Sequence, residues 1–343
     1  MKLSDFDYEL PEELIAQAPL TERDKARLLV FQNSKIIHSV FKELPSFLSK
    51  DDCLVINDSK VIHCRIFGKR PSGGKTEIFL LKRIDDLRWE ALLQPLKKIK
   101  PDTEIKILQD LYCVLEKPKR FDVPNIVRFN RSVDFDTLSK IGHIPLPPYI
   151  KRSYSSIDEE NKDRIYYQTV YAKKEGSVAS PTAGLHFTEE LLSKIQNMGV
   201  KIARVTLDIS WATFKPVKTE NIEEHKMHKE HYILDEENAD IIRSTKGRII
   251  AVGTTSCRVL EAINRKFNEI RPDEDETDIF LRPGNPPVVI DGLITNFHLP
   301  RSTLLMLVAS FIGYNETLNI YNIAVKERYR FYSYGDAMLL LKS

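Results

Sequence analysis

The second half of the chain alternates short apolar segments with amphipathic ones, and this alternation constrains the fold more than any other feature. Thr188 can cap a helix that opens with two glutamates, buries one apolar face and stops at Gly199. Further strands are predicted at 200–209, 248–252 and 288–295, and further helices at 256–267 and 303–312. Strands that alternate with helices favour parallel pairing. We therefore predict an α/β fold in which a mixed, largely parallel sheet carries helices on both faces.

Residues 61–150 follow a different pattern, made of short β segments. Turn signals such as Gly73-Gly74 separate them, no helix signal is present, and a proline-rich run at 142–149 ends the region. Segments this short and regular predict a small β-barrel. The predicted strands are 65–67, 76–81, 88–94, 104–108, 112–116 and 126–130. We predict an inserted β-barrel domain at 61–150 and an α/β catalytic body formed by 1–60 and 151–343.

The predicted barrel is also the basic part of the chain. Residues 61–155 carry a net charge of +8 and the rest of the chain −6, although the total is only +2. A basic module on a mildly acidic body indicates a polyanionic partner such as nucleic acid. A lysine-rich, solvated surface explains the same count, so charge leaves both interpretations open.

Cysteine spacing and hydropathy indicate the compartment. The 4 cysteines, Cys53, Cys64, Cys113 and Cys257, form no C-x-x-C pair, which argues against a zinc knuckle or a disulfide framework. Small buried thiols in a reducing compartment explain them better. Residues 1–7 are too acidic and polar for a signal peptide, and the longest apolar run, 304–312, is too short to span a bilayer. We expect a cytoplasmic protein without a membrane segment.

One predicted strand-to-helix junction has residues suited to an anion. Open parallel sheets bind ligands at the carboxyl ends of their strands. Gly253, Thr254 and Thr255 follow the predicted strand 248–252, and Arg258 lies one turn further on. Glycine lets a ligand approach the backbone, and the free amides of a helix start attract a carboxylate or phosphate. The alternative is that the hydroxyls only cap the helix.

Two other junctions present a histidine in a loop before a helix. The run 177–188 contains Thr182, Ala183, Gly184 and His186, and the run 295–300 contains Thr295, Asn296 and His298. An imidazole there can serve as an acid or a base near neutral pH. A structural role explains either histidine alone, but two in matching positions favour a site.

The remaining candidate sites are less specific. His225, His228 and His231 recur every three residues, but this is not a standard zinc spacing, so hydrogen bonding to a substrate or a polar surface is favoured over a metal. The aromatic run 329–336 can stack a base or form a core strand. A P-loop, a dinucleotide fingerprint and a G-x-S-x-G elbow are missing from the sequence, which argues against nucleotide hydrolysis, dinucleotide redox chemistry and α/β-hydrolase chemistry.

Longer stretches of the sequence match one known family along the whole chain. The longest are PTAGLHFT at 181–188 and DGLITNFHLP at 291–300. The others are DFDYELP at 5–11, RDKARLL at 23–29, NDSKV at 57–61, GGK at 73–75, GHIPLPPY at 142–149, EH at 224–225, MH at 227–228, AVGTT at 251–255 and YRFYSYGDAM at 329–338. With these stretches the chain resembles the S-adenosylmethionine:tRNA ribosyltransferase-isomerases of queuosine synthesis.

The resemblance implies a two-domain enzyme and an unusual reaction. S-adenosylmethionine would donate its ribosyl group to the 7-aminomethyl-7-deazaguanine base at the wobble position of tRNAs with GUN anticodons. The products would be epoxyqueuosine-tRNA, adenine and methionine, with no metal or redox cofactor. The expected partners are therefore tRNA and S-adenosylmethionine as co-substrate, and we expect a monomer.

The resemblance also suggests roles for the candidate residues. The reaction needs a base beside the sulfonium and a proton donor for adenine, and we assign His186 and His298 to this acid–base work, with Asp208 as a third catalytic candidate. Gly253, Thr254 and Thr255 would bind the methionine carboxylate or another anion. Asp58, Thr182 and Asn296 would orient the ribose or base, and the wider substrate-binding set adds Ala183, Gly184, Arg258, Thr295, His225 and His228.

One segment departs from the family pattern. Asp208 stands where the family usually has histidine, and Ser210 and Ala212 stand where it usually has glycine. Ser180 replaces an alanine and Lys60 an arginine, which are milder changes. Two alternatives therefore stay open: a catalytically impaired homologue that still binds tRNA, and a metal-dependent hydrolase centred on His225, His228 and His231.

Overall fold

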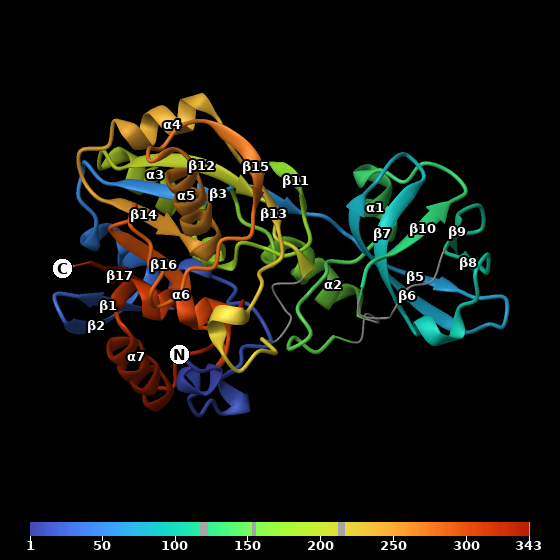
Figure 1. Cartoon of the computed structure of the whole chain (residues 1–343), viewed down its shortest axis with the longest axis horizontal. Helices are drawn as coiled ribbons and strands as arrows, with labels where there is room; N and C mark the ends of the chain where they lie inside the picture. The colour runs from blue at the N-terminus through green and yellow to red at the C-terminus, as the bar shows by residue number, and fades with distance from the viewer. Residues whose placement is uncertain (117–122, 153–155, 212–216, 343) are drawn as a thin grey trace.

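A computed structural model of the chain describes residues 1–116, 123–152, 156–211 and 217–342. Figure 1 shows a large body that holds both termini and a smaller barrel beside it. The body is built on a nine-stranded sheet with the order β15-β13-β12-β3-β14-β16-β17-β1-β2. Its strands are β1 (Arg27–Gln32), β2 (Lys35–Val40), β3 (Cys53–Asn57), β12 (Lys201–Leu207), β13 (Glu230–Leu234), β14 (Ile249–Val252), β15 (Asp273–Thr277), β16 (Gly292–Asn296) and β17 (Ala337–Leu341).

The sheet is parallel in its centre and antiparallel towards both edges. Strands β12, β3, β14 and β16 run parallel to one another, and β1 runs parallel to β17. The pairs β12–β13, β13–β15, β16–β17 and β1–β2 are antiparallel. This confirms the predicted mixed, largely parallel sheet.

Helices cover both faces of this sheet, as predicted. One core cluster contains Val55 of β3 with residues of α4 (Glu236–Arg243), α5 (Gly253–Phe267), α6 (Thr303–Ile312) and α7 (Tyr314–Lys326). The other contains Leu54, the next residue along β3, with residues of α3 (Glu189–Asn197) and the 3-10 helix η4 (Phe41–Phe47). Alternate residues of a strand point to opposite faces, so one strand supplies both cores.

The predicted cap of α3 is confirmed. The Thr188 side chain accepts a hydrogen bond of 3.1 Å from the Leu191 amide, and Gly199 adopts a φ of +87° directly after the helix. The other short helices of the body are η1 (Leu3–Phe6), η2 (Glu12–Leu14), η3 (Arg23–Lys25), η6 (Thr182–His186) and η8 (Ile222–Glu224).

The six strands predicted for the basic segment form a closed barrel in the order β10-β7-β6-β5-β8-β9. They are β5 (Arg65–Lys69), β6 (Lys75–Arg83), β7 (Arg88–Gln94), β8 (Glu104–Lys106), β9 (Tyr112–Leu115) and β10 (Asn125–Phe129), with η5 (Leu96–Lys98) between β7 and β8. The expectation of no helix was wrong. Helix α1 (Phe135–Ile141) follows β10, and the Asp134 side chain caps it.

Two elements link barrel and body. Strand β4 (Ser59–Val61) pairs with β11 (Lys174–Ser177) where the chain enters the barrel. Helix α2 (Ile157–Tyr166) lies between barrel and body in Figure 1. Its Arg164 donates hydrogen bonds of 2.8 Å to the carbonyls of Ser139 and Gly142. The domain limits 1–60 with 151–343 and 61–150 remain our proposal.

Two simpler expectations can be compared with the structure. All 4 cysteines are buried and free. In the described ranges, every helix is too short or too polar to cross a membrane.

Candidate active site

A pocket of about 620 Å³ opens at the carboxyl ends of β14 and β16. This edge of an open sheet is where ligands bind. The predicted residues that line it are Thr182, Ala183, Gly253, Thr254, Thr255, Arg258, Thr295, Asn296 and His298. Residues from three separate junctions of the sequence therefore meet around one cavity, which we call the large pocket.

The start of α5 forms one wall of the large pocket. Gly253 has a φ of +89°, a backbone conformation that favours glycine. No side chain caps the helix: the residue before it is Val252, and the Ser256 hydroxyl donates backwards to the Val252 carbonyl at 2.9 Å. The alternative that these hydroxyls only cap the helix is therefore wrong. The free amides of the first turn remain available to an anion.

A buried ion pair lies one turn further along α5. The Arg258 guanidinium donates to one carboxylate oxygen of Glu230, and the other oxygen accepts a hydrogen bond of 2.8 Å from the Ser210 amide. Both charged side chains are buried. Sequence reasoning missed Glu230, because a single glutamate at the start of a strand gives no signal of a buried partner.

His298 is the predicted catalytic histidine that lines the large pocket. Its Nε2 lies 2.7 Å from the Thr295 hydroxyl, and its backbone amide donates to the Tyr321 hydroxyl at 3.1 Å. Its carbonyl accepts a hydrogen bond from Tyr8. Burial lowers the pKa of His298 to about 3. The imidazole is therefore neutral at physiological pH. Thr295 holds its ring nitrogen, and Tyr321 and Tyr8 hold the backbone of the residue.

His186 lies behind the wall of the large pocket. Its ring packs against Phe41 with centroids 5.0 Å apart, and its Nε2 lies 3.1 Å from the Asn296 amide nitrogen. Asn296 in turn accepts a hydrogen bond of 3.0 Å from the Thr182 hydroxyl. Burial, followed by the charges of Arg330 and Arg23, lowers the pKa of His186 to about 3. His186 is linked to the pocket through Asn296.

Asp58, Asp208 and Gly184 line neither the large pocket nor the smaller cavity described next. Asp58 accepts a hydrogen bond of 2.7 Å from Thr206. Asp208 lies 3.4 Å from the Nδ1 atom of His231, and burial raises the pKa of its carboxyl group. Gly184 is enclosed by Tyr171, whose hydroxyl would lie 1.9 Å from an added Cβ, so packing is enough to require this glycine.

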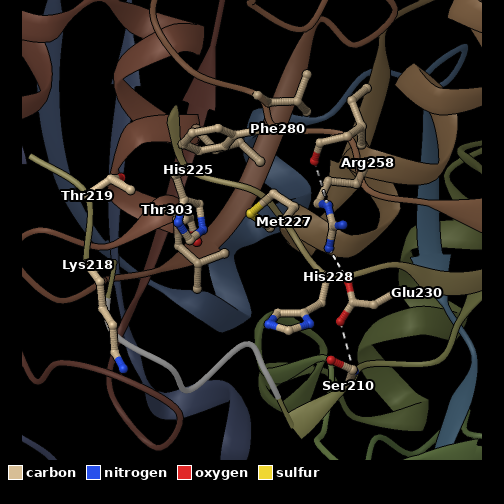
Figure 2. A pocket seen from close by; sticks show the side chains of 14 residues that line it. Ser210, Lys218, Thr219, His225, Met227, His228, Glu230, Arg258, Phe280 and Thr303 are labelled. Carbon is tan, nitrogen blue, oxygen red and sulfur yellow. Dashed lines mark hydrogen bonds and ion pairs between the residues drawn. The ribbon is translucent and has the colours of Figure 1, made fainter. Parts of the chain in front are cut away.

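A second chamber of about 260 Å³ adjoins the large pocket and shares Glu230, Arg258, Thr303 and Leu304 with it. His225 and His228 line it, as Figure 2 shows. His231 lies outside, between Asp208 and Glu274. Within the described parts of the chain, no three His, Cys, Asp or Glu residues are grouped so as to hold a metal ion.

Aromatic residues complete the large pocket on the barrel side. Tyr149, from the proline-rich run, and Tyr332, from the aromatic run, have ring centroids 4.2 Å apart, and both line the cavity. Tyr329 and Phe331 of the same run are fully buried in the core. The aromatic run is therefore mainly core, with Tyr332 exposed to the site. Sequence reasoning left base stacking by this run open but named neither tyrosine as a site residue, because their contact joins positions 183 residues apart.

The segment with unusual residues is partly described. Ser210 lines the second chamber and holds Glu230, as above. Ala212 lies outside the described residues. The Lys60 side chain lies 2.9 Å from Glu175 across the β4–β11 pair, away from the residues that line either cavity.

One end of the barrel carries clustered cations. Lys69 lies directly opposite Lys75 on one neighbouring strand and opposite Lys106 on the other, and all three side chains are exposed. Arg70 continues the cluster and donates a hydrogen bond of 3.1 Å to the Lys98 carbonyl. Like charges on facing positions destabilise a sheet, so this end is suited to an anionic partner.

Comparisons with known proteins agree with one another. A family model described as queuosine biosynthesis protein matches residues 3–340. The S-adenosylmethionine:tRNA ribosyltransferase-isomerase of Acetivibrio thermocellus is 49% identical over 352 residues, covering 99% of this chain and 100% of that protein. The protein of the same description from Carboxydothermus hydrogenoformans is 49% identical over 347 residues, with the same coverage. The crystal structure of the S-adenosylmethionine tRNA ribosyltransferase of Thermotoga maritima is 37% identical, covers 98% of this chain and 100% of that one, and has a TM-score of 0.55.

Proposed function

The chain belongs to the queuosine biosynthesis family, and from this premise we propose that its large pocket is the active site of a ribosyl transfer from S-adenosylmethionine to tRNA. The enzyme is an S-adenosylmethionine:tRNA ribosyltransferase-isomerase. It transfers and isomerises the ribosyl group onto the 7-aminomethyl-7-deazaguanine base and forms epoxyqueuosine in the tRNA. Adenine and methionine are the other products. Relatedness over 99% of the chain is the observation that carries this conclusion.

The neutral imidazole of His298 supports its proposed acid–base role. Removal of a proton beside the sulfonium requires a group that is unprotonated before the reaction, and burial keeps the His298 imidazole unprotonated. The same burial lowers its pKa to about 3, below the range near the working pH in which a general base is most effective. The bond to Thr295 fixes the ring within the pocket wall. We propose His298 as the group that exchanges protons with the substrate.

His186 is better suited to positioning than to direct proton transfer. It touches Asn296 and not the cavity, while Asn296 and Thr182 both line the cavity. We propose that His186 orients the Asn296 amide, which then holds the ribose or the base.

The start of α5 supports binding of the methionine part of the substrate. Gly253, Thr254 and Thr255 line the large pocket at the first turn of α5, and a helix of 15 residues adds a favourable dipole for a carboxylate. The Glu230–Arg258 pair closes the same side.

We also propose which tRNA the enzyme modifies, where it binds the tRNA phosphates, and in which compartment and oligomeric state it acts. We propose that the acceptor is a tRNA with a GUN anticodon, that the basic end of the barrel binds its phosphates, and that the enzyme acts in the cytoplasm as a monomer. The lysine cluster supports the phosphate contact, because such contacts dominate affinity for nucleic acid.

Mass spectrometry of the tRNA tests the function directly. The enzyme is incubated with S-adenosylmethionine and tRNA that carries the precursor base, and the tRNA is then digested to nucleosides. We expect epoxyqueuosine to appear, and to be missing with tRNA that carries guanine at that position. Binding of tRNA without any new nucleoside would instead indicate the catalytically impaired homologue.

A further inference from the structure

The second chamber has walls of a distinct chemical type. Phe280, Met227 and His225 lie around one side of it in Figure 2, with Leu304 and Leu307 from α6 among the other lining residues. The rings of His225 and Phe280 meet edge to face with centroids 5.5 Å apart. Such walls of aromatic, thioether and aliphatic groups suit a flat apolar ring.

The charges of the chamber lie at its ends. Arg258 and Glu230 neutralise each other at one end, and Lys218 lies on the opposite side in Figure 2 with its side chain exposed. Burial, together with the neighbouring His228, lowers the pKa of His225, so its imidazole is neutral. A neutral imidazole offers one donor and one acceptor, which is the pattern of the edge of a nucleobase.

The position of the second chamber indicates which nucleobase of the reaction it holds, the adenine of S-adenosylmethionine or the acceptor base of the tRNA. Pro148 and Tyr149, from the segment that follows the barrel, line the large pocket and do not line the second chamber. A base of a tRNA whose phosphates bind the barrel would therefore reach the large pocket first. The second chamber lies beyond Arg258, against the loop after β15. A substrate bound in both cavities must therefore extend one part past the Glu230–Arg258 pair.

We infer that the second chamber binds the adenine ring of S-adenosylmethionine, with Phe280 as its main apolar contact and His225 at the base edge. This inference rests on the proposed function. It adds His225 and Phe280 to the groups that recognise the substrate, and it separates the site of the leaving base from the site of the acceptor base. Loss of one aromatic contact to a base weakens binding by about tenfold or more.

Binding of adenine alone tests the inference without any turnover. Equilibrium dialysis with radiolabelled adenine, and separately with S-adenosylmethionine, compares the natural protein with Phe280→Ala, Phe280→Tyr and Phe267→Ala. Phe267 is a matched control, because it is a half-buried phenylalanine at the far end of α5 that lines neither cavity. A thermal melt of each variant checks that it is folded.

We expect Phe280→Ala to weaken adenine and S-adenosylmethionine binding by about tenfold or more, Phe280→Tyr to restore both, and Phe267→Ala to change neither. Unchanged adenine binding in folded Phe280→Ala would overturn the inference. Weaker binding of tRNA to folded Phe280→Ala with unchanged binding of S-adenosylmethionine would overturn it too, since the chamber would then hold the acceptor base. Adenine binding that depends on Phe280, in a protein that modifies no tRNA, would uphold the chamber and overturn the proposed function.

Discussion

Asn296 connects the buried ring of His186 to the large pocket: its amide nitrogen lies 3.1 Å from His186 Nε2, and its oxygen accepts a hydrogen bond from Thr182. The two histidines predicted as an acid–base pair therefore occupy different positions. His298 lines the cavity, whereas His186 lies behind it and contacts Phe41. We therefore propose that His298 touches the substrate and that His186 orients Asn296.

Replacement of His186 should lower turnover without preventing folding. We expect His186→Ala to reduce kcat by more than about tenfold, because the Asn296 amide loses the acceptor that fixes its orientation. His186→Gln should restore part of the rate, since its amide oxygen can take the place of Nε2. His38→Ala is the control. His38 lies on the edge strand β2, and its Nδ1 contacts the Tyr329 hydroxyl. A nearly normal rate in folded His186→Ala would remove His186 from the mechanism.

The buried neutral histidines should make the protein sensitive to acid. His298 has a pKa of about 3 when folded and an ordinary value of 6.5 when unfolded. Between these values the unfolded chain binds a proton that the folded chain does not, so stability falls as pH falls from about 6.5 towards 3. From pH 7 to pH 5 this histidine should cost about 2 kcal/mol of unfolding free energy.

Urea unfolding at pH 7 and pH 5 measures this effect. The natural protein should lose about 2 kcal/mol more between the two pH values than His298→Gln, which has no proton to gain. Equal losses in the two proteins would show that His298 is not held neutral by burial.

The sequence predicted the parts of the site that lie at the ends of strands. Asn296 ends strand β16, and Thr254 and His298 lie two residues beyond the ends of β14 and β16. Because parallel strands end at one edge, the meeting of these residues could be predicted. Glu230, Tyr149 and Tyr332 join the site through contacts between distant segments, which no spacing reveals. The face of the sheet towards which His186 turns also depends on packing.

The fold shows the same division. The apolar strands of the sheet centre and the short strands of the barrel were predictable from period and turns. Strand β15 reads Asp-Glu-Asp-Glu-Thr and carries no apolar signal, and its place comes from pairing with β13 and from ion pairs to Lys266. Helix α1 has 7 residues, too few for a helical period to be distinguished from a strand.

The predicted catalytic role of Asp208 can be separated from that of His298. Asp208 contacts His231 and lines neither cavity. We expect Asp208→Asn to keep the hydrogen bond and to change kcat by less than about threefold, whereas His298→Gln should lower it by about a hundredfold, as loss of an acid–base group does. Steady-state kinetics of the two variants provide the comparison. A loss of about a hundredfold in Asp208→Asn would return Asp208 to the catalytic groups.

Charge reversal at the barrel end should weaken tRNA binding in a salt-dependent way. We expect the double variant Lys69→Glu/Lys106→Glu to bind tRNA about tenfold more weakly and to have a shallower dependence of affinity on salt, because each lost phosphate contact removes about 0.7 to 0.9 of the slope. Lys50→Glu/Lys246→Glu is the control, since these exposed lysines precede β3 and β14, at the edge opposite the large pocket. Filter binding at several salt concentrations measures both. Equal affinities in the two variants would exclude this end of the barrel from the tRNA contact.

Release of adenine from S-adenosylmethionine is the direct test of ribosyl transfer to the precursor base. Chromatography follows adenine in the presence of tRNA with the precursor base, of tRNA with guanine at that position, and of no tRNA. We predict adenine only with the precursor tRNA, because transfer of the ribosyl group to that base is what frees it. No adenine with the precursor tRNA, from a protein that binds this tRNA, would contradict the assignment of a ribosyltransferase-isomerase.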